Sequence, residues 1–280
     1  MTTLIPLATK LFAKGEYENP TGSIKDRAAL AILQDAAARG LLSPGGTVIE
    51  ATSGNMGISL AALCRQQGFS CIIVMPDSMS VQRQQMMASY GAKVVLTPGT
   101  DGMIGAIAQA EALRQQIPGS FLPRQFDNPA SVLAHYHTTG PEIWEQSGGN
   151  VEVFVAGVGT GGTLTGTAKY LKAQNPSIRI VAVEPAASPL LSNGWSGSHG
   201  IQGIGANFVP AILDTSLIDE VVTVTDADAI ATARALNRKG LPVGISAGAN
   251  VWAAGKFAKS GAYTVTVLPD SADRYGELIR

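Results

Sequence analysis

The sequence predicts an α/β protein made of two three-layer units with mainly parallel sheets. Short apolar runs of strand character alternate with longer segments of helical periodicity in both halves of the chain. Between the halves, residues 119–131 contain Pro123 and Pro129 and show no clear periodicity. Because strands that are joined through helices pair in parallel with right-handed crossovers, this alternation predicts two α/β units around a cleft.

The elements follow one another regularly. In the first half we expect strands over 47–51, 70–75 and 93–96. The helices between them are expected over 56–67, 80–90 and 100–116, the last beginning near Thr100 or Asp101 as its cap. The second half predicts strands over 152–155, 179–183, 221–224 and 264–268, with helices over 164–174, 226–239 and 249–259.

The change of domain is predicted near residue 128. A smaller, mobile substrate-binding unit would cover 1–128, with its first residues able to cross to the other unit, and a larger unit would cover 129–280. In open parallel sheets, ligands bind at the carboxyl ends of the strands, so this edge is the expected ligand site.

Composition excludes several classes of protein. The 280 residues include 20 basic and 21 acidic side chains, so the net charge of −1 gives no strong attraction to nucleic acid or to an anionic membrane. No apolar run approaches the roughly 20 residues of a membrane-spanning helix. The two cysteines and three histidines match no metal-binding spacing, and no metal is expected. With no leader-like start, a cytoplasmic protein is expected.

A glycine-rich loop follows the predicted strand 152–155 and opens the next helix. It reads Gly157-Val-Gly159-Thr-Gly161-Gly162-Thr163. Glycines let backbone amides approach an anion, and the start of a helix adds a favourable dipole, so a phosphate is the expected ligand. The alternative is a tight strand–helix turn without a ligand.

The same loop satisfies the dinucleotide-binding fingerprint. Gly157, Gly159 and Gly162 have the required spacing, and Glu184 follows near the offset of a ribose-binding acid. An NAD-dependent enzyme is therefore a rival interpretation. A second rival, a serine hydrolase with Ser246 in Gly-Ile-Ser-Ala-Gly, is disfavoured because every histidine precedes Ser246.

A second polar turn, 50–57, carries the hydroxyls of Thr52 and Ser53 and the amide of Asn55 at the start of a helix. These groups suit a small anion such as a carboxylate. The equally open alternative is an ordinary helix cap, in which Thr52 or Ser53 satisfies the first amides.

Lys25 is predicted to stand in the first turn of a helix, where the dipole disfavours an ammonium group. A lysine kept partly neutral is suited to act as a nucleophile or base. Taken alone, a solvated surface lysine is the competing interpretation.

Seven segments, each present once, are spread over nearly the whole chain: ENPTGSIKDR (18–27), EATSGNMGI (50–58), QFDNP (125–129), TTGPEIW (138–144), GVGTGGTLTG (157–166), IQGIGANF (201–208) and GISAGA (244–249). Together they resemble the cysteine synthase family, the O-acetylserine sulfhydrylases of the fold type II pyridoxal-phosphate enzymes. The resemblance outweighs the dinucleotide interpretation. It implies two α/β domains with pyridoxal 5'-phosphate in the cleft between them.

The resemblance also implies roles by position. Lys25 matches the lysine that forms the Schiff base with the cofactor and moves the Cα proton. The other cofactor-binding matches are Asn55 at the ring hydroxyl, Gly159, Thr160, Gly161, Gly162 and Thr163 at the phosphate, and Ser246 at the pyridine nitrogen. The substrate-binding matches are Thr52, Ser53, Gly54, Asn55, Met56, Gln125 and Gly203.

The implied reaction is β-replacement, in which O-acetylserine and sulfide, or another thiol or thiosulfate, give L-cysteine or an S-substituted analogue and acetate. Members of the family that use O-phosphoserine tend to have an arginine in the loop before the IQGIG segment, whereas residues 186–200 here contain no Arg or Lys, so the resemblance disfavours a phosphate leaving group. Met56 stands where the family usually has threonine, which removes one hydroxyl and is expected to bring a thioether into the carboxylate site. The resemblance further implies a homodimer and binding of a serine acetyltransferase C-terminal tail.

Two alternatives stay open. One is a serine/threonine deaminase or a cystathionine β-synthase-like enzyme that uses the same cofactor. The other is a non-catalytic paralogue that binds an acyltransferase tail; the presence of Lys25 argues against it, and Met56 argues for it.

Overall fold

The computed structural model describes residues 1–279 and divides into two compact units. The smaller unit comprises residues 25–130. The larger unit is discontinuous, because residues 1–24 join residues 131–280. Both units have the α/β architecture and parallel strands that the sequence predicts.

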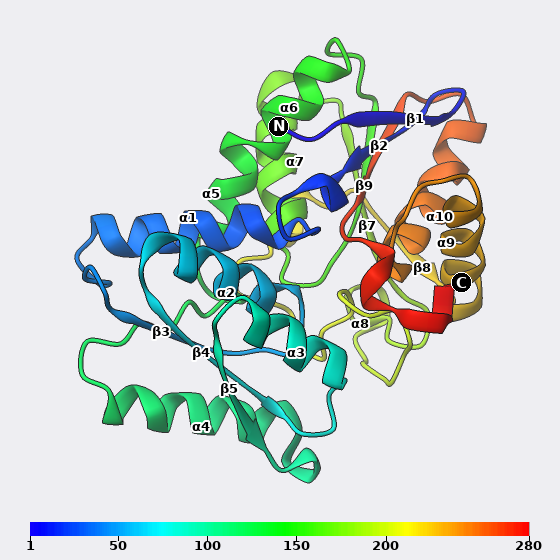
Figure 1. The fold of residues 1–280 in the computed structure, drawn as a ribbon. Coiled ribbons are helices and arrows are strands. Elements are labelled where there is room, and N and C mark those ends of the chain that lie inside the picture. Colours follow the sequence, from blue (N-terminus) through cyan, green and yellow to red (C-terminus); the bar gives the residue numbers. More distant parts are fainter. Residues whose placement is uncertain (280) are drawn as a thin grey trace. The chain divides into compact units, whose positions relative to one another are not determined.

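The smaller unit is a three-layer sandwich. Its parallel sheet has the order β3 (Thr47–Ala51), β4 (Ser70–Pro76), β5 (Lys93–Thr97). One face is covered by three helices, α1 (Lys25–Ala38), α2 (Asn55–Gln67) and α3 (Val81–Ser89), and the other by α4 (Gly102–Gln116) (Figure 1). The central strand β4 is buried on both sides, which explains its uninterrupted apolar run.

The larger unit has a six-stranded sheet. Its order is β1 (Leu4–Ala8), β2 (Leu11–Gly15), β9 (Thr264–Leu268), β6 (Val153–Gly157), β7 (Arg179–Pro185), β8 (Glu220–Val224). Only the β1–β2 pair is antiparallel among these described strands. One face is covered by α9 (Asp226–Arg238) and α10 (Ile245–Lys259), and the other by α6 (Thr139–Gln146) and α7 (Gly162–Gln174). Two further helices are α5 (Ala130–His137) and the short α8 (Leu190–Asn193).

The sequence did not predict the β1–β2 hairpin. Each strand has only five residues, and the pairing register shifts between Pro6 and Ala8. Lys10, in the turn, has a φ of 61°, which non-glycine residues rarely adopt. The hairpin therefore depends on pairing with β9 rather than on a strong local signal.

A buried ionic network fixes this hairpin to α6. The Lys14 side chain on β2 has no exposed surface, and its Nζ lies 2.7 Å from Oε2 of Glu142. Lys14 Nζ also donates to Oε1 of Gln146 at 3.1 Å and to the carbonyl of Thr2. The Thr2 amide donates to the same Glu142 oxygen at 3.2 Å. The first residues of the chain, β2 and the distant helix α6 are thus joined around one buried lysine.

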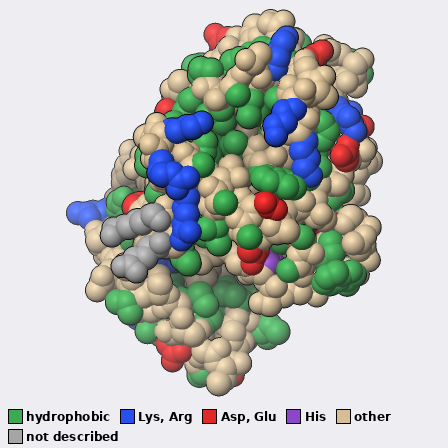
Figure 2. Space-filling view, turned by 90° about the vertical axis from the view of Figure 1, so that its right-hand side faces the viewer, with side chains coloured by type: hydrophobic (Ala, Val, Ile, Leu, Met, Phe, Trp, Pro, Cys, Tyr) green, Lys and Arg blue, Asp and Glu red, His purple; other side chains and the backbone are tan. Residues whose placement is uncertain are grey.

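The surface carries no dominant charge on the face that Figure 2 shows. Lys and Arg side chains lie there among hydrophobic and uncharged surface, and a few Asp and Glu side chains are interspersed. Within residues 1–279, no helix is long and apolar enough to cross a membrane. The same residues contain no cluster of three or more His, Cys, Asp or Glu side chains suited to a metal ion.

Candidate active site

Lys25 is the first residue of α1, as the sequence predicts. Loss of solvation on burial lowers the pKa of its amine to about 8. The start of the helix is fixed by Asp26, whose Oδ1 accepts a hydrogen bond of 2.6 Å from the Ser59 hydroxyl on α2. The carboxylate of Asp26 also suits the positive end of the α1 dipole. A substantial fraction of neutral amine near pH 8 makes Lys25 suited to nucleophilic and proton-transfer chemistry.

The turn that precedes α2 begins that helix without a side-chain cap. Gly54 is the N-cap residue and makes no side-chain capping hydrogen bond. The Thr52 hydroxyl accepts from the Gly54 amide at 3.2 Å, outside the helix. The first amides of a helix have no intrahelical acceptor, so this turn has the geometry of an anion site rather than of a hydroxyl-capped helix.

Arg83 supports the same turn. Its guanidinium, on α3, donates to the Ser53 carbonyl at 3.0 Å. The sequence analysis did not single out this residue, because arginine on a polar helix is normally a surface residue. Its contact with the turn places a positive charge near Gly54, where it favours an anionic ligand.

Met56 has its side chain in the core of the smaller unit. Its exposed fraction is 1%, and it packs in the cluster that α1, α2 and β4 form. The next residue, Gly57, leaves room for the methyl group of Met87 and for Cγ2 of Thr52. The Met56 side chain therefore contributes to core packing, and the expectation that its thioether enters the carboxylate site is not met in this structure.

We expect Met56→Thr to destabilise the protein. The substitution exchanges a buried thioether for a smaller hydroxyl side chain, which leaves a cavity and buries a polar group. The expected loss is about 2 kcal/mol of unfolding free energy, measured by chemical denaturation. A matched control is Met79→Thr, at a half-buried position before α3, which should cost less. A Met56→Thr variant with unchanged stability and higher turnover would support a thioether in the carboxylate site instead.

Gln125 lies in a turn that begins just after Phe121, which pairs in parallel with β3. Its side chain is buried, and its backbone amide donates to the Glu50 carboxylate at 3.4 Å. Lys25, 52–56 and Gln125 are all carried by the smaller unit. This unit thus holds every predicted substrate-binding residue except Gly203.

The larger unit carries the glycine loop between β6 and α7. Gly161 caps α7 with a φ of 86°, a conformation that favours glycine. A Cβ at Gly159 would lie 2.3 Å from the Gly203 carbonyl oxygen, so only glycine permits this approach. Gly203 itself has a φ of 94°. The loop therefore presents backbone amides at the start of a helix, as phosphate binding requires.

Ser246 lies on the same unit, in the first turn of α10. Its side chain is buried, and its Oγ is 4.0 Å from the position a Cβ of Gly203 would take. The neighbouring Asn250 accepts from the Gly157 amide at 2.8 Å and donates to the Val267 carbonyl at 2.9 Å. The structure thus brings together Ser246, Gly203 and the glycine loop.

His135 is a residue whose connection to the site the sequence did not reveal. It is buried on α5, and its Nε2 lies 3.3 Å from the Thr163 hydroxyl. Its Nδ1 lies 2.9 Å from the Thr139 hydroxyl. This chain of hydrogen bonds orients Thr163 at the start of α7. No sequence motif marks His135. Its contact with Thr163 becomes visible only when the position of α5 next to the glycine loop is known.

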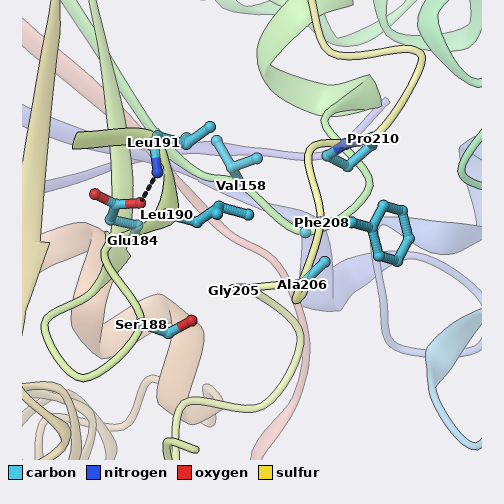
Figure 3. A pocket seen from close by; sticks show the side chains of 10 residues that line it. Val158, Glu184, Ser188, Leu190, Leu191, Gly205, Ala206, Phe208 and Pro210 are labelled. Carbon is cyan, nitrogen blue, oxygen red and sulfur yellow. Dashed lines mark hydrogen bonds between the residues drawn. The ribbon is translucent and has the colours of Figure 1, made fainter. Parts of the chain in front are cut away.

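Glu184 does not serve as a ribose-binding acid. Its buried carboxylate accepts hydrogen bonds from the Leu191 amide at 2.7 Å and from the Ser192 amide at 3.1 Å and hydroxyl at 2.6 Å. Figure 3 shows the Glu184 side chain directed at Leu191, in a pocket that is otherwise largely apolar. Because α8 uses both oxygens, the dinucleotide interpretation loses its acidic residue.

A model of the family described as pyridoxal-phosphate dependent enzyme matches residues 2–270. The chain belongs to this family. Cysteine synthase B of Campylobacter jejuni subsp. jejuni serotype O:2 is 48% identical over 267 residues, covering 95% of this chain and 89% of that protein. Cysteine synthase of Staphylococcus aureus (strain Mu50) is 45% identical over 273 residues, covering 96% and 88%. The crystal structure of cysteine synthase from Entamoeba histolytica superimposes with a TM-score of 0.94 at 38% identity, covering 99% and 87%.

The predictions of a fold type II pyridoxal-phosphate enzyme and of its cofactor are thereby confirmed. The residues of this pyridoxal-phosphate dependent enzyme also fit the cofactor. The glycine loop is kept open by Gly159 and Gly161, where a side chain would collide with Gly203 or Leu213. Lys25 supplies an amine of lowered pKa, and the neutral form that this favours is the one that can react with an aldehyde.

Proposed function

We propose that the protein is a cysteine synthase that converts O-acetylserine and sulfide into L-cysteine and acetate. The observation that carries the proposal is the site lysine of lowered pKa, in a chain that matches cysteine synthases over almost its full length. The absence of Arg and Lys from residues 186–200 favours acetate over phosphate as the leaving group.

The residues of both units have distinct roles in this proposal. Lys25 would hold the cofactor through its aldehyde group, with loss of water, and the amides and hydroxyls of 159–163 would bind its phosphate. We assign Asn55 to the ring hydroxyl and Ser246 to the pyridine nitrogen. When bound, the cofactor supplies an electron sink for the bond electrons at Cα of the amino acid.

The chemistry of the chain's own groups follows from these assignments. The amides and hydroxyls of 52–56, together with Gln125, hold the substrate carboxylate and leave its Cα hydrogen facing Lys25. With substrate bound, the Lys25 amine would be released from the cofactor as a neutral base; it then accepts the Cα proton, and the bond from Cβ to the acetate oxygen breaks. Sulfide then bonds to Cβ, and Lys25 returns the proton to Cα. Gly203 lies in the loop that would close over the substrate.

The test is an assay of the purified holoenzyme with O-acetylserine and sulfide, in which cysteine and acetate are measured. We expect equal amounts of both products and no pyruvate. Release of pyruvate without cysteine would favour a deaminase, and no reaction together with binding of an acyltransferase tail would favour the non-catalytic alternative. Assays with thiosulfate and with larger thiols identify the preferred sulfur nucleophile.

Assembly and location are further parts of the proposal. We propose a homodimer that acts in the cytoplasm and binds the C-terminal tail of a serine acetyltransferase at the 52–56 turn. A tail ends in a carboxylate, which is the group that this uncapped helix start suits. Light scattering and competition between a tail peptide and O-acetylserine test these points.

A further inference from the structure

Glu50 is a buried carboxyl group that the proposed reaction does not use directly. It lies on β3, just before the 52–56 turn, and has an exposed fraction of 5%. Its Oε2 accepts a hydrogen bond of 3.1 Å from the Arg124 amide. Its Oε1 accepts one of 3.4 Å from the Gln125 amide. Each carboxylate oxygen thus holds one of two consecutive amides from a distant part of the chain.

The held turn has an unfavourable backbone conformation. Arg124 has a φ of 50°, in the left-handed region that non-glycine residues seldom occupy. Its carbonyl accepts from the amides of Asp127 and Asn128 at 2.9 and 3.0 Å, which closes the turn on itself. Such a conformation persists where surrounding contacts fix it, and Glu50 provides two of those contacts.

We propose that Glu50 is a positioning residue for substrate binding, which fixes the backbone of 124–125 and thereby directs the Gln125 side chain toward the substrate carboxylate. The inference rests on the proposed function. Phe121 pairs with β3 through hydrogen bonds of 2.8 and 2.9 Å, so the chain enters the turn alongside the strand that carries Glu50. Gln125 follows Arg124 directly, and its direction depends on the constrained conformation of that residue.

The charges around Glu50 make this arrangement sensitive to pH. Burial raises the pKa of Glu50 to about 7, against the lowering effect of the two amides and of Arg124, and Asp127 adds to the rise. The free thiol of Cys71 on β4 interacts electrostatically with the same carboxyl group and shares a hydrogen bond with the free thiol of Cys64 on α2. The ionised carboxylate, present above pH 7, accepts both amides well. The protonated group, present below pH 7, is a weaker acceptor, so substrate binding weakens as the pH falls through 7.

The decisive variant is Glu50→Gln, with Glu111→Gln as the matched control. Glutamine replaces one acceptor by a donor, so one of the two backbone amides loses its partner. Glu111 pairs with the exposed guanidinium of the same Arg124 at 2.7 Å and leaves the backbone contacts intact. We expect Glu50→Gln to raise the KM for O-acetylserine by roughly tenfold with a kcat within about threefold, and Glu111→Gln to change neither.

A double variant distinguishes positioning from general damage. If Glu50 acts through Gln125, then adding Glu50→Gln to Gln125→Ala raises the KM by less than about twofold. A further tenfold rise in the double variant would overturn the proposal, and so would an unchanged KM in Glu50→Gln. If Glu50→Gln does not fold, Glu50→Asp retains the charge but shortens its reach. An unchanged KM in Glu50→Asp, with no pH dependence of substrate binding near 7 in the native enzyme, would likewise exclude the proposal.

A binding measurement separates this inference from the proposed function. L-alanine has the α-carboxylate but no leaving group, and its binding to the holoenzyme can be followed through the visible absorbance of the cofactor. Weaker alanine binding by Glu50→Gln supports the positioning role even if no cysteine is formed. Failure of the native enzyme to make cysteine, with alanine binding reduced by the variant, contradicts only the proposed function.

Discussion

Replacing Lys25 with alanine is expected to lower cysteine formation by at least about a thousandfold and to remove the visible colour of the bound cofactor. The variant lacks the amine that bonds the aldehyde, and it lacks the base that moves the Cα proton. Because burial lowers the pKa of this amine to about 8, its removal relieves a desolvated group and should not destabilise the apoprotein. Absorbance spectra and single-turnover assays measure the two losses.

The matched control is Lys93→Ala, an exposed lysine on β5 of the same unit, which should retain colour and activity. The pH dependence gives an independent check. The neutral fraction of the Lys25 amine increases as the pH rises through 8, so the rate at which apoprotein captures pyridoxal phosphate should rise up to that pH and then level off. A capture rate that is flat between pH 6 and 8 would contradict the assigned pKa of Lys25.

Lys14→Met is expected to give the second large effect, a loss of about 3–5 kcal/mol in the free energy of unfolding. The substitution leaves the carboxylate of Glu142, which is 9% exposed, without its ammonium partner at 2.7 Å. The Thr2 amide then remains as a neutral donor at 3.2 Å. Chemical denaturation of the apoprotein, followed by circular dichroism, measures the loss.

The double variant Lys14→Met/Glu142→Leu should recover most of that stability, because it removes both buried charges together. Lys172→Met is the control, at an ion pair that is more accessible to solvent. Its partner Asp219 lies at 2.9 Å on the surface, and breaking such a pair should cost less than about 1 kcal/mol. If the double variant is as unstable as Lys14→Met, then the lysine stabilises the hairpin through its other contacts, with Gln146 and Thr2, rather than through Glu142.

Much of the fold could be predicted because its signals are local. The strand over 70–75 is a nearly continuous apolar run. The glycine loop indicates a close approach of the backbone to a ligand. The hairpin at Leu4–Gly15 could not be predicted, because its stability comes from a strand near the other end of the chain. Similarly, no local pattern shows that the Met56 side chain faces the core. Met56 is the second residue of α2, and within the first turn of a helix successive side chains point in different directions.

In the candidate site, too, some residues are marked by local sequence signals and others are recognised only through distant contacts. Lys25, the 52–56 turn and the 159–163 loop carry motifs, whereas Glu50, Arg83 and His135 act through partners far away in the sequence. Glu50 contacts amides 74 and 75 residues later, and His135 contacts Thr163 28 residues later. Residue type gives no indication of such contacts.

The position of β9 between β2 and β6 has a consequence for how the chain is made. Residues 25–130 form a continuous unit and can complete their core while translation is still under way. The larger unit cannot, because β2 finds its parallel neighbour only when residues 264–268 have left the ribosome. The β2 edge of the first hairpin therefore stays without its neighbouring strand through nearly the whole synthesis of the protein. A chain that ends before residue 264 would leave that edge exposed to other molecules, while its smaller unit would already be folded.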